Sequence, residues 1–476
     1  MVVAFVAAVF AWFGAAMAEY SAAQALLGFV VLLMAAPFLQ PQVAVFAVAR
    51  HFARGALPAP LAAVAGCCVW VATEWMFPKL LADNLAHGIY PSVVLRQGAA
   101  FAGTAGLTFA ILLVNECVCA AVSRAGRGAR EALGPLAAAV AIVAALTAYG
   151  HHRLAVLAAA AKDDTPVRVA LVQANIAGYE RLRREMGAYE AVRLVLDTHF
   201  SLSRTAVAAQ QVDAVVWPET VFPTTFGSPK SDAGAELDRE IRAFVDALGV
   251  PLVFGSYDSD AGGEYNSAVF LGPGTATAGV YRKSRLFLFT EYLPGWMDTE
   301  WVRTLLPWAG AWKPGPGARV LPLALADGRV LPVAPLICLD DVDPGLAIDG
   351  ARLGARAFFS MSNDSWFAGD GGGARLHLVV AAFRSIETGL PQMRVTNNGI
   401  SAVVTSSGEV LESAPVGDRR VLAAEVPPAS GEITRMVAWG DWFGWASALA
   451  SVLFLALGAS GRLSPRTRAD KATASG

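Results

Sequence analysis

Charged residues are scarce in this chain: they make up 16% of its 476 residues, whereas soluble domains carry about a quarter. The formal net charge of −2 lacks the basic excess that a nucleic-acid-binding surface needs, so we expect no nucleic-acid partner. Hydrophobic residues reach 55%, and the longest runs of them lie toward the two ends of the sequence. This composition predicts a membrane region combined with a globular domain in the middle of the chain.

Cysteine is also rare, with five in the whole chain. Four of them lie in apolar runs, and the spacings Cys67-Cys68 and Cys117-Val118-Cys119 are poor metal-ligand spacings, so we expect these side chains to pack in helices. Cys338 is the one cysteine of the predicted globular part and has no disulfide partner there. No cluster of ligands in the sequence indicates a metal or an organic cofactor, and we expect neither.

Six apolar runs are long enough to predict membrane-spanning helices. Five lie in region 1–159 and one in region 438–459, and a disordered polar tail is expected over 460–476. The predicted spans are Val2–Ala18, Ala23–Phe38, Leu61–Leu81, Gln97–Val122, Leu133–Tyr149 and Trp442–Leu457. The first run lacks a charged start, so we interpret it as a retained helix rather than a signal peptide.

Basic residues predict how the spans are oriented. Three clusters fall on one side if the six spans alternate: Arg50 and Arg54; Arg124, Arg127 and Arg130; and Arg462, Arg466, Arg468 and Lys471. The first of these clusters is expected to interrupt the helices between the second and third spans. By the positive-inside rule that side is the cytoplasm, which places both termini inside and region 160–437 outside.

Two carboxylates lie within the predicted spans, Glu74 in the third and Glu116 in the fourth. A carboxylate in a membrane span is costly, and it usually marks either a functional site or a hydrogen bond between helices. The sequence favours neither explanation over the other.

Region 160–437 alternates apolar strands with amphipathic helices, which predicts an α/β layered domain. The predicted strands include Val167–Gln173, Pro251–Gly255, Asn266–Leu271, Gly279–Leu286 and Ala355–Met361. The predicted helices are Gly178–Gln210, Ala233–Leu248, about ten residues after Cys338, and His377–Thr388. We expect His377 to be a structural residue.

Three reactive side chains each stand at or near the end of a predicted strand: Glu219, Lys283 and Cys338. Taken singly, each has an ordinary explanation, because a lone cysteine is usually a small buried apolar residue and strand-end charges are usually solvated. Together they supply a base, a cation and a nucleophilic thiol. The combination therefore predicts a covalent active site.

The order of these three residues and their flanking segments resembles the nitrilase superfamily, and within it the membrane-bound apolipoprotein N-acyltransferases. Further resemblance lies in residues 362–367, 394–399 and 439–443, and the whole resemblance covers about residues 60–460. It implies a four-layer α-β-β-α sandwich joined to a multi-pass helical membrane region. It also implies a bacterial inner-membrane location, with the catalytic domain 160–437 on the periplasmic side.

The resemblance implies a role for each site residue. Glu219, Lys283 and Cys338 correspond to the catalytic Glu-Lys-Cys triad. The supporting residues are Glu291, Leu339, Asp340 and Trp366. Leu339 and Asp340 depart from the family, which usually has an aromatic residue and a Glu there, and Thr290 departs from the Gly that usually precedes the supporting Glu.

The same resemblance implies an acyl transfer in two steps. A phospholipid would donate an acyl chain to Cys338 as a thioester, and the N-terminal amine of an S-diacylglyceryl-cysteine lipoprotein would accept it. Two alternatives remain open: a membrane-anchored amidase or hydrolase that uses water as the acceptor, and a non-catalytic module that binds lipid or lipoprotein.

Aromatic residues crowd the segment between Lys283 and Cys338, which has no helical or strand periodicity. Tryptophan suits the membrane interface, so we predict that part of the segment is a mobile lid containing Phe289, Trp296 and Trp301. The alternative is that these side chains fill the core of the domain.

Overall fold

The structure is a computed structural model that describes residues 2–14, 25–77, 79, 81–160, 167–176, 178–274, 279–367, 371–427, 429 and 431–460. The chain divides into two compact units, a helical unit of residues 1–156 and 434–476 and an α/β unit of residues 157–433. The predicted catalytic domain, 160–437, nearly coincides with the second unit. The side of the membrane on which it lies stays a prediction.

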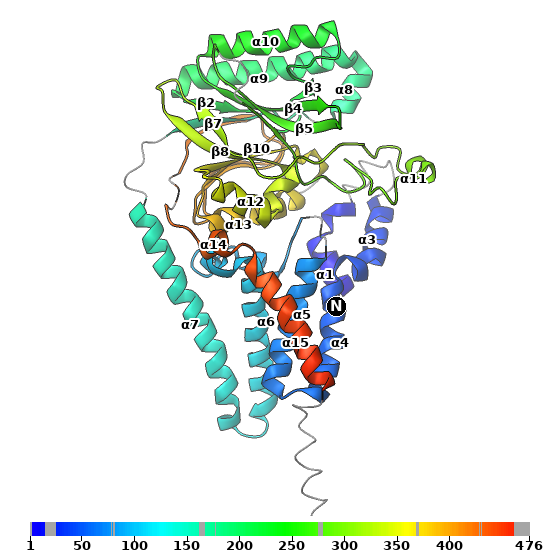
Figure 1. Cartoon of the computed structure of the whole chain (residues 1–476), viewed down its shortest axis with the longest axis vertical. Coiled ribbons are helices and arrows are strands. Elements are labelled where there is room, and N and C mark those ends of the chain that lie inside the picture. Colours follow the sequence, from blue (N-terminus) through cyan, green and yellow to red (C-terminus); the bar gives the residue numbers. More distant parts are fainter. Residues whose placement is uncertain are drawn as a thin grey trace, which may run out of the picture. The chain divides into compact units, whose positions relative to one another are not determined.

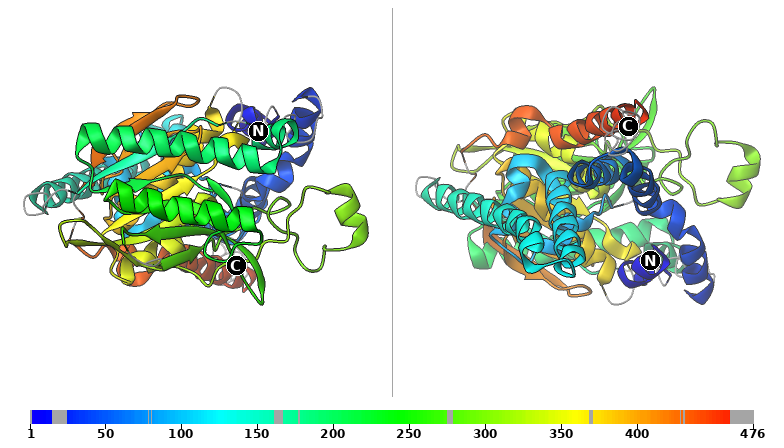
Figure 2. Two further views of the ribbon diagram at one scale, coloured as in Figure 1. Left: turned by 90° about the horizontal axis from the view of Figure 1, so that it is seen from above. Right: turned by 90° about the horizontal axis from the view of Figure 1, so that it is seen from below.

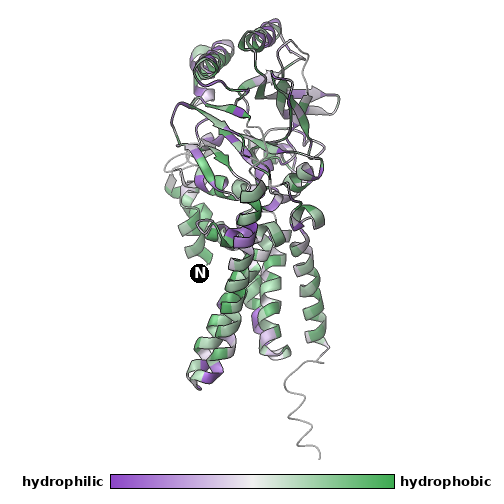
Figure 3. Cartoon of the chain, turned by 90° about the vertical axis from the view of Figure 1, so that its left-hand side faces the viewer, coloured by the Kyte–Doolittle hydropathy of each residue, from purple (hydrophilic) through white to green (hydrophobic). Residues whose placement is uncertain are grey.

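The helical unit is built from long apolar helices, which Figure 3 colours largely as hydrophobic. Its helices are α1 (Val2–Val9), α3 (Ala25–Leu39), α4 (Pro41–Ala56), α5 (Ala59–Met76), α6 (Ala99–Ala125), α7 (Ala129–Ala160), α14 (Arg435–Trp439) and α15 (Trp442–Ala459), with 3₁₀ turns η1 (Leu85–Ile89) and η2 (Leu95–Gly98). Among the described residues, four helical stretches are long and apolar enough to cross a membrane: Ala59–Met76, Leu95–Ala125, Ala129–Ala159 and Trp442–Ala459. The pair α3 and α4, bent by 40° between them, makes a fifth if it counts as one span.

The first two predicted spans were wrong in detail. Val2–Ala18 is not one helix, because α1 ends at Val9 and a bend and turn follow at Phe10 and Ala11, while residues 15–24 lie outside the described part. Ala23–Phe38 corresponds to α3, which is only half of the bent pair. The other four predicted spans are confirmed as helices, so the described part contains four or five helical stretches that could span a membrane, against six that were predicted.

The predicted interruption at Arg50 and Arg54 was also wrong, because both residues lie inside α4. The guanidinium of Arg50 forms an ion pair with Glu116 of α6, at 2.6 Å between Nη2 and Oε2. Pairing offsets the cost of each charge and lets the helix continue. Glu116 therefore has a structural explanation, a contact between helices.

The last helix of this unit is anchored to α5. The Trp75 indole donates a hydrogen bond to Oδ2 of Asp441, immediately before α15, at 2.7 Å. Gly444 lies against the same ring, since a Cβ there would meet it at 2.4 Å. Segment 439–443, one of those that carry the family resemblance, thus fixes where the final helix begins.

The α/β unit is a four-layer α-β-β-α sandwich, as the resemblance implied (Figure 1). One sheet has the order β13-β1-β2-β4-β5-β6, with β3 also paired to β4: β1 (Arg168–Gln173), β2 (Ala214–Val216), β3 (Phe222–Thr225), β4 (Leu252–Asp260), β5 (Gly263–Leu271), β6 (Gly279–Arg282) and β13 (Arg420–Glu425). The other has the order β12-β11-β10-β9-β8-β7: β7 (Leu321–Ala324), β8 (Val330–Ile337), β9 (Ala357–Ser362), β10 (Gln392–Thr396), β11 (Ser401–Val404) and β12 (Val410–Ala414). The first strand, β1, pairs antiparallel with the last, β13, from Arg168 opposite Glu425 to Gln173 opposite Arg420.

Helices cover the outer face of each sheet. The first sheet is covered by α9 (Ala188–Gln210) and α10 (Asp232–Leu248), which run side by side in Figure 2. The second is covered by α12 (Pro344–Arg352) and α13 (Gly372–Thr388). Phe200 of α9 and Phe244 of α10 stack at 4.2 Å between ring centroids, within the core that also holds Trp217.

Two predicted helices are each divided in two. Gly178–Gln210 forms α8 (Tyr179–Met186) and α9, separated at Gly187, whose φ of +92° breaks the helix. The stretch after Cys338 forms a 3₁₀ turn, η3 (Cys338–Val342), and then α12. Asp343 separates these two, because its side chain accepts the first N–H groups of α12 and Pro344 opens that helix.

Strand direction brings the reactive residues to one region of the sandwich. In the first sheet β2 and β4 are parallel, and two antiparallel steps through β5 give β6 the same direction. In the second sheet β8, β9 and β10 are parallel. Loops that follow β2, β6, β8 and β9 therefore carry the candidate site at the carboxyl ends of strands, where α/β sheets usually place their ligands.

Candidate active site

Glu219 lies in the loop after β2, held close against β4. A Cβ at Gly255 of β4 would lie 2.3 Å from the Thr220 nitrogen and 2.6 Å from Cα of Glu219, so this approach requires glycine. The Gly255 N–H also donates to the Pro218 carbonyl at 3.1 Å. The buried backbone around Glu219 is thus fixed by a contact that any side chain at position 255 would prevent.

Lys283 follows β6 and is 1% exposed. Its ammonium donates to Oε1 of Glu219 at 3.0 Å and to Oε1 of Glu291 at 2.8 Å. Burial would lower the pKa of Lys283, but the two carboxylates outweigh it and raise that pKa well above its usual value. The side chain is therefore a fixed, desolvated cation.

Asn266 of β5 holds both carboxylates together and was missed by the sequence analysis. Its Nδ2 donates to Oε1 of Glu219 at 2.7 Å and to Oε1 of Glu291 at 3.3 Å, and its side chain is 5% exposed. The backbone carbonyl of Asn266 accepts a hydrogen bond from the backbone N–H of Lys283 at 2.8 Å, which joins β5 to the residue that follows β6. The position of Asn266 beside the two carboxylates depends on the register between β5 and β6, and no local sequence pattern predicts that register.

Cys338 stands where β8 turns into η3, with a φ of +51° that is rare for a residue other than glycine. The side chain is buried. Burial raises the pKa of the Cys338 thiol, the ammonium of Lys283 lowers it, and burial prevails, so the pKa lies well above its usual value. The resting group is a protonated thiol, and its attack on a substrate requires a base.

Asp340 joins the turn of Cys338 to the loop of Lys283. Its Oδ1 accepts the backbone N–H groups of Ser284 at 3.1 Å and Arg285 at 2.7 Å. Its Oδ2 accepts the Tyr281 hydroxyl at 2.9 Å and the Ile337 N–H at 3.0 Å. This fully buried carboxylate, whose pKa burial raises to about 7, thus connects the residues that flank the thiol and the ammonium. Leu339 lies between Cys338 and Asp340 and is also buried.

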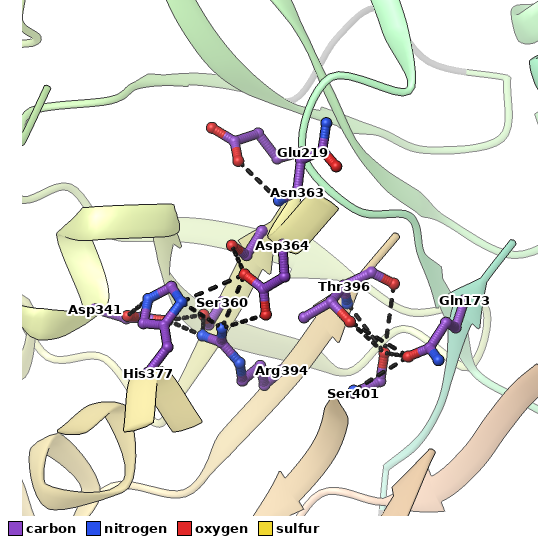
Figure 4. Close-up of polar contacts among 11 residues, drawn as sticks. Gln173, Glu219, Asp341, Ser360, Asn363, Asp364, His377, Arg394, Thr396 and Ser401 are labelled. Carbon is purple, nitrogen blue, oxygen red and sulfur yellow. Dashed lines mark hydrogen bonds and ion pairs between the residues drawn. The ribbon is translucent and has the colours of Figure 1, made fainter. Parts of the chain in front are cut away.

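A buried network of charges includes Asp341, which belongs to η3, the 3₁₀ turn that begins at Cys338 (Figure 4). The His377 ring contacts Oδ1 of Asp341 at 2.9 Å and Oδ1 of Asp364 at 3.3 Å. Arg394 donates to Asp341 and, at 3.2 Å, to Oδ2 of Asp364. Burial and Arg394 would lower the pKa of His377, but the two carboxylates outweigh them and raise it to about 9. His377 and Arg394 therefore hold Asp341, three residues after Cys338, and Asp364 is the second carboxylate that both of them contact.

The second sheet also contacts Glu219. The Asn363 N–H, just after β9, donates to Oε2 of Glu219 at 2.8 Å (Figure 4). Asn363 lies in segment 362–367, one of those that carry the family resemblance, and Trp366 of the same segment ends a 3₁₀ turn, η4 (Asp364–Trp366). The Trp366 side chain lies outside the described part, so its supporting role stays a prediction.

The aromatic-rich segment between Lys283 and Cys338 is held by hydrogen bonds at Glu291 and is exposed farther along the chain. Oε2 of Glu291 accepts the Phe287 N–H at 2.7 Å, and the Glu291 carbonyl accepts the Trp312 N–H at 3.0 Å. Farther along, Trp296 is 81% exposed and Trp301, in α11 (Glu300–Leu305), is 72% exposed within the chain, so these two rings do not fill the core. Phe289 is also exposed, and the lid itself stays a prediction.

The structure thus brings Glu219, Lys283 and Glu291 into direct contact, with Cys338 close enough for the ammonium to lower the pKa of its thiol. A carboxylate, an ammonium and a thiol at converging strand ends are the groups that nucleophilic acyl transfer uses, which makes this region the candidate active site. Among the described residues, no group of three or more His, Cys, Asp and Glu side chains is arranged to hold a metal ion.

Comparison with known proteins agrees with this class. Residues 168–436 match the carbon-nitrogen hydrolase family. The apolipoprotein N-acyltransferase of Caulobacter vibrioides is 32% identical over 85% of this chain and 73% of its own length. That of Geobacter metallireducens is 29% identical over 82% of this chain and 73% of its own length. Among solved structures, Nit3 of Saccharomyces cerevisiae is 17% identical, with a TM-score of 0.42 over 56% of this chain and 91% of that chain.

These similarities first place the α/β unit among the carbon-nitrogen hydrolases. The chain as a whole belongs to the apolipoprotein N-acyltransferase family.

Proposed function

We propose that this protein moves an acyl chain from a phospholipid to the N-terminal amine of a bacterial lipoprotein, through a thioester on Cys338. The observation that carries the proposal is the contact of Lys283 with Glu219 and Glu291, in a buried site beside the thiol. Membership of the family and the apolar helices of the chain support the same substrate classes.

In the first half of the reaction, Glu219 takes the proton of the Cys338 thiol as the sulfur attacks the phospholipid ester. The oxyanion that forms would be stabilised by the ammonium of Lys283, which is already in place and desolvated. When the ester bond breaks, Glu219 returns the proton to the departing oxygen of the lysophospholipid. The acyl chain then remains on sulfur.

In the second half, the α-amine of the lipoprotein attacks the thioester. Glu219 takes a proton from the attacking nitrogen, Lys283 again faces the oxyanion, and the proton passes to the departing Cys338 sulfur. Asn266 and the Asn363 N–H hold the Glu219 carboxylate in position through both halves. The products are an amide on the lipoprotein and a restored thiol.

We further propose that the protein lies in the inner membrane with residues 160–437 on the periplasmic side. Within the helical unit, the α4–α5 turn, the α6–α7 turn and the end of α15 lie at one end (Figure 1). Arg54 and Arg124 stand near the first two, which supports a cytoplasmic location for that end. Exposed Trp296 and Trp301 would then serve as the membrane-contacting part of a lid.

The decisive experiment is complementation of a bacterium depleted of its own N-acyltransferase, followed by mass spectrometry of a lipoprotein N-terminus. We expect the wild-type chain to restore growth and N-acylation, and Cys338→Ala to restore neither. Cys119→Ala, which alters an exposed thiol of α6, is the matched control and should behave as wild type. Release of free fatty acid without N-acylated lipoprotein would instead identify the hydrolase alternative.

A further inference from the structure

Aromatic side chains lie beside the carboxylates of the candidate active site. Tyr257 of β4 is paired directly with Asn266 of β5, so the two side chains lie on the same face of the first sheet. Asn266 is the residue whose Nδ2 donates to both Glu219 and Glu291. The half-buried side chain of Tyr257 is therefore a near neighbour of both carboxylates.

Trp312 packs against Tyr257. The two rings lie 4.5 Å apart between centroids, with 53° between their planes. The backbone N–H of Trp312 donates to the Glu291 carbonyl at 3.0 Å. Gly310 lies close to the indole, since a Cβ there would be 2.7 Å from Cδ1 of Trp312. The indole is thus held beside Tyr257 by the same loop that carries Glu291.

The surroundings of Tyr257 are negative and include a third aromatic residue. Burial raises the pKa of the Tyr257 hydroxyl, and Tyr179, Glu219, Glu291 and Glu180 each raise it further. These groups act on the hydroxyl because they lie near it, so the hydroxyl stays neutral at physiological pH. Tyr257, Trp312 and Tyr179 together are called the aromatic cluster below.

Tyr179, the first residue of α8, is fixed by contacts of its own. It is half-buried and packs, with Ile176, against the core of the first sheet. Oδ1 of Asn397 accepts the Ile176 N–H at 3.0 Å, and Nδ2 of Asn397 donates to the Ile176 carbonyl at 2.7 Å. The start of α8 is therefore held in place close to the candidate site.

The charges beside the aromatic cluster do not balance, and one hydrogen-bond acceptor there is unsatisfied. Glu219 and Glu291 share the ammonium of Lys283, so the formal charge of these three residues is −1. The Asn266 amide has a settled orientation, because its Nδ2 donates to two carboxylate oxygens. Its Oδ1 is buried and accepts no hydrogen bond from any described residue. A cation that carries N–H groups would supply both the charge and the donor.

We infer that the aromatic cluster recognises the α-ammonium group of the lipoprotein acceptor. An ammonium is attracted to the faces of aromatic rings, and aromatic cages bind such groups. The neighbouring carboxylates add an attraction for the same charge. The inference rests on the proposed acyl transfer and adds to it the residues that select an amine over water as the acceptor.

The acceptor arrives with one proton more than the reaction needs. The bound ammonium loses this proton to the solvent before its nitrogen attacks the thioester. The second proton passes through Glu219 to the Cys338 sulfur, so the products are one amide, one thiol and one released proton. Tyr257 takes no proton in this scheme, and it contributes binding only.

Binding is tested first, on the full chain with Cys338→Ala in detergent micelles. The probes are a dipalmitoyl S-glyceryl-cysteine lipopeptide with a free amine and the same lipopeptide after N-acetylation, which removes the charge. We expect the free amine to bind about tenfold more tightly. Tyr257→Leu in the same background should abolish this preference.

Reaction is tested next, from the thioester formed on Cys338. The acceptors, kept below saturation, are the free-amine lipopeptide and hydroxylamine, which is uncharged at neutral pH. Tyr257→Leu should lower the ratio of the lipopeptide rate to the hydroxylamine rate about tenfold. Tyr257→Phe keeps the ring and should stay close to the wild-type ratio. Tyr265→Leu is the matched control, because Tyr265 precedes Asn266 in β5 and its side chain lies on the opposite face.

Three results would overturn the inference. Equal weakening of both lipopeptides by Tyr257→Leu would mean that Tyr257 does not sense the charge of the amine. An equal loss of rate with lipopeptide and hydroxylamine would mean that Tyr257 acts through Glu219 and not on the acceptor. A loss of thioester formation as large as the loss of aminolysis would assign the aromatic cluster to the headgroup of the donor. The binding measurement needs no chemistry, so a preference for the free amine without N-acylated lipoprotein in cells would refute the proposed function alone.

Discussion

Replacing Lys283 by Met tests the charge arrangement of the proposed site directly. The substitution removes a buried cation that contacts Glu219 and Glu291 and leaves an apolar chain of similar length. Met cannot stabilise an oxyanion, and it leaves two carboxylates with no cation between them.

The first effect is the loss of transition-state stabilisation. One lost oxyanion donor typically costs about 10²–10³-fold in rate, or about 3–4 kcal/mol. The second effect is electrostatic: Glu219 and Glu291 share the Nδ2 donor of Asn266, so without the ammonium one of them must take up a proton. A protonated Glu219 cannot act as the base, and the total loss should exceed about 10³-fold.

The assay is single-turnover formation of the acyl-thioester, followed by intact mass spectrometry with excess phospholipid. A double variant separates the two effects. Lys283→Met with Glu291→Gln restores the original formal charge of −1 among the three residues, so it should recover the thermal stability lost by Lys283→Met. It should not recover thioester formation, because the oxyanion still lacks its cation.

Two outcomes would refute this reasoning. Thioester formation within about tenfold of wild type in Lys283→Met would show that Lys283 is not the oxyanion cation. Recovery of the full rate in the double variant would show that Lys283 serves only to balance the carboxylates.

Four further predictions follow from other parts of the structure. Glu219→Gln should form thioester at least about 10²-fold more slowly while alkylation of the unfolded chain is unchanged; a near-normal rate would remove Glu219 as the base. Folding raises the pKa of His377 from 6.5 to about 9, so protonation of this residue stabilises the folded chain by on the order of 3 kcal/mol below pH 6.5, and this stabilisation is lost as the pH rises through 9. Unfolding of His377→Gln in detergent should lack this pH-dependent loss of stability. Trp296→Ser with Trp301→Ser should reduce turnover of long-chain phospholipid far more than alkylation of the thiol by a small electrophile, whereas equal losses would contradict a lid. Ser259→Cys should react with an impermeant reagent in intact spheroplasts, and reaction only after lysis would reverse the proposed orientation.

The main features of the fold could be predicted because they follow from local patterns. Long apolar runs mark helices α5, α6, α7 and α15, and alternating strands and helices mark the α/β unit. The four layers came from the family resemblance, since periodicity does not specify how sheets stack. The α3–α4 pair was mispredicted because Arg50 was counted as an isolated charge, whereas Glu116, distant in sequence, pairs with it.

The candidate site shows the same division between local and distant information. Glu219, Lys283 and Cys338 could be proposed as site residues because each stands at or beside a strand end and together they match a known order. Asn266 could not, since its contact with two carboxylates arises from the pairing of β5 with β6. His377 was expected to be structural, but its contacts with two buried carboxylates could not be predicted, because Asp341 and Asp364 lie 36 and 13 residues away in the sequence.

The antiparallel pairing of β1 with β13 brings the two ends of the α/β unit together. Arg168 and Glu425 are direct neighbours across the sheet, and the Val426 N–H donates to the Val167 carbonyl at 2.7 Å. The polypeptide therefore enters and leaves the sandwich at adjacent points, about one strand spacing apart. Short linkers are therefore enough to connect the sandwich to the helices on either side, because closure of the domain does not require its ends to be held apart. The same topology means that some 250 residues separate β1 from its antiparallel partner β13, so the first sheet can be completed only after nearly the whole α/β unit has been synthesised.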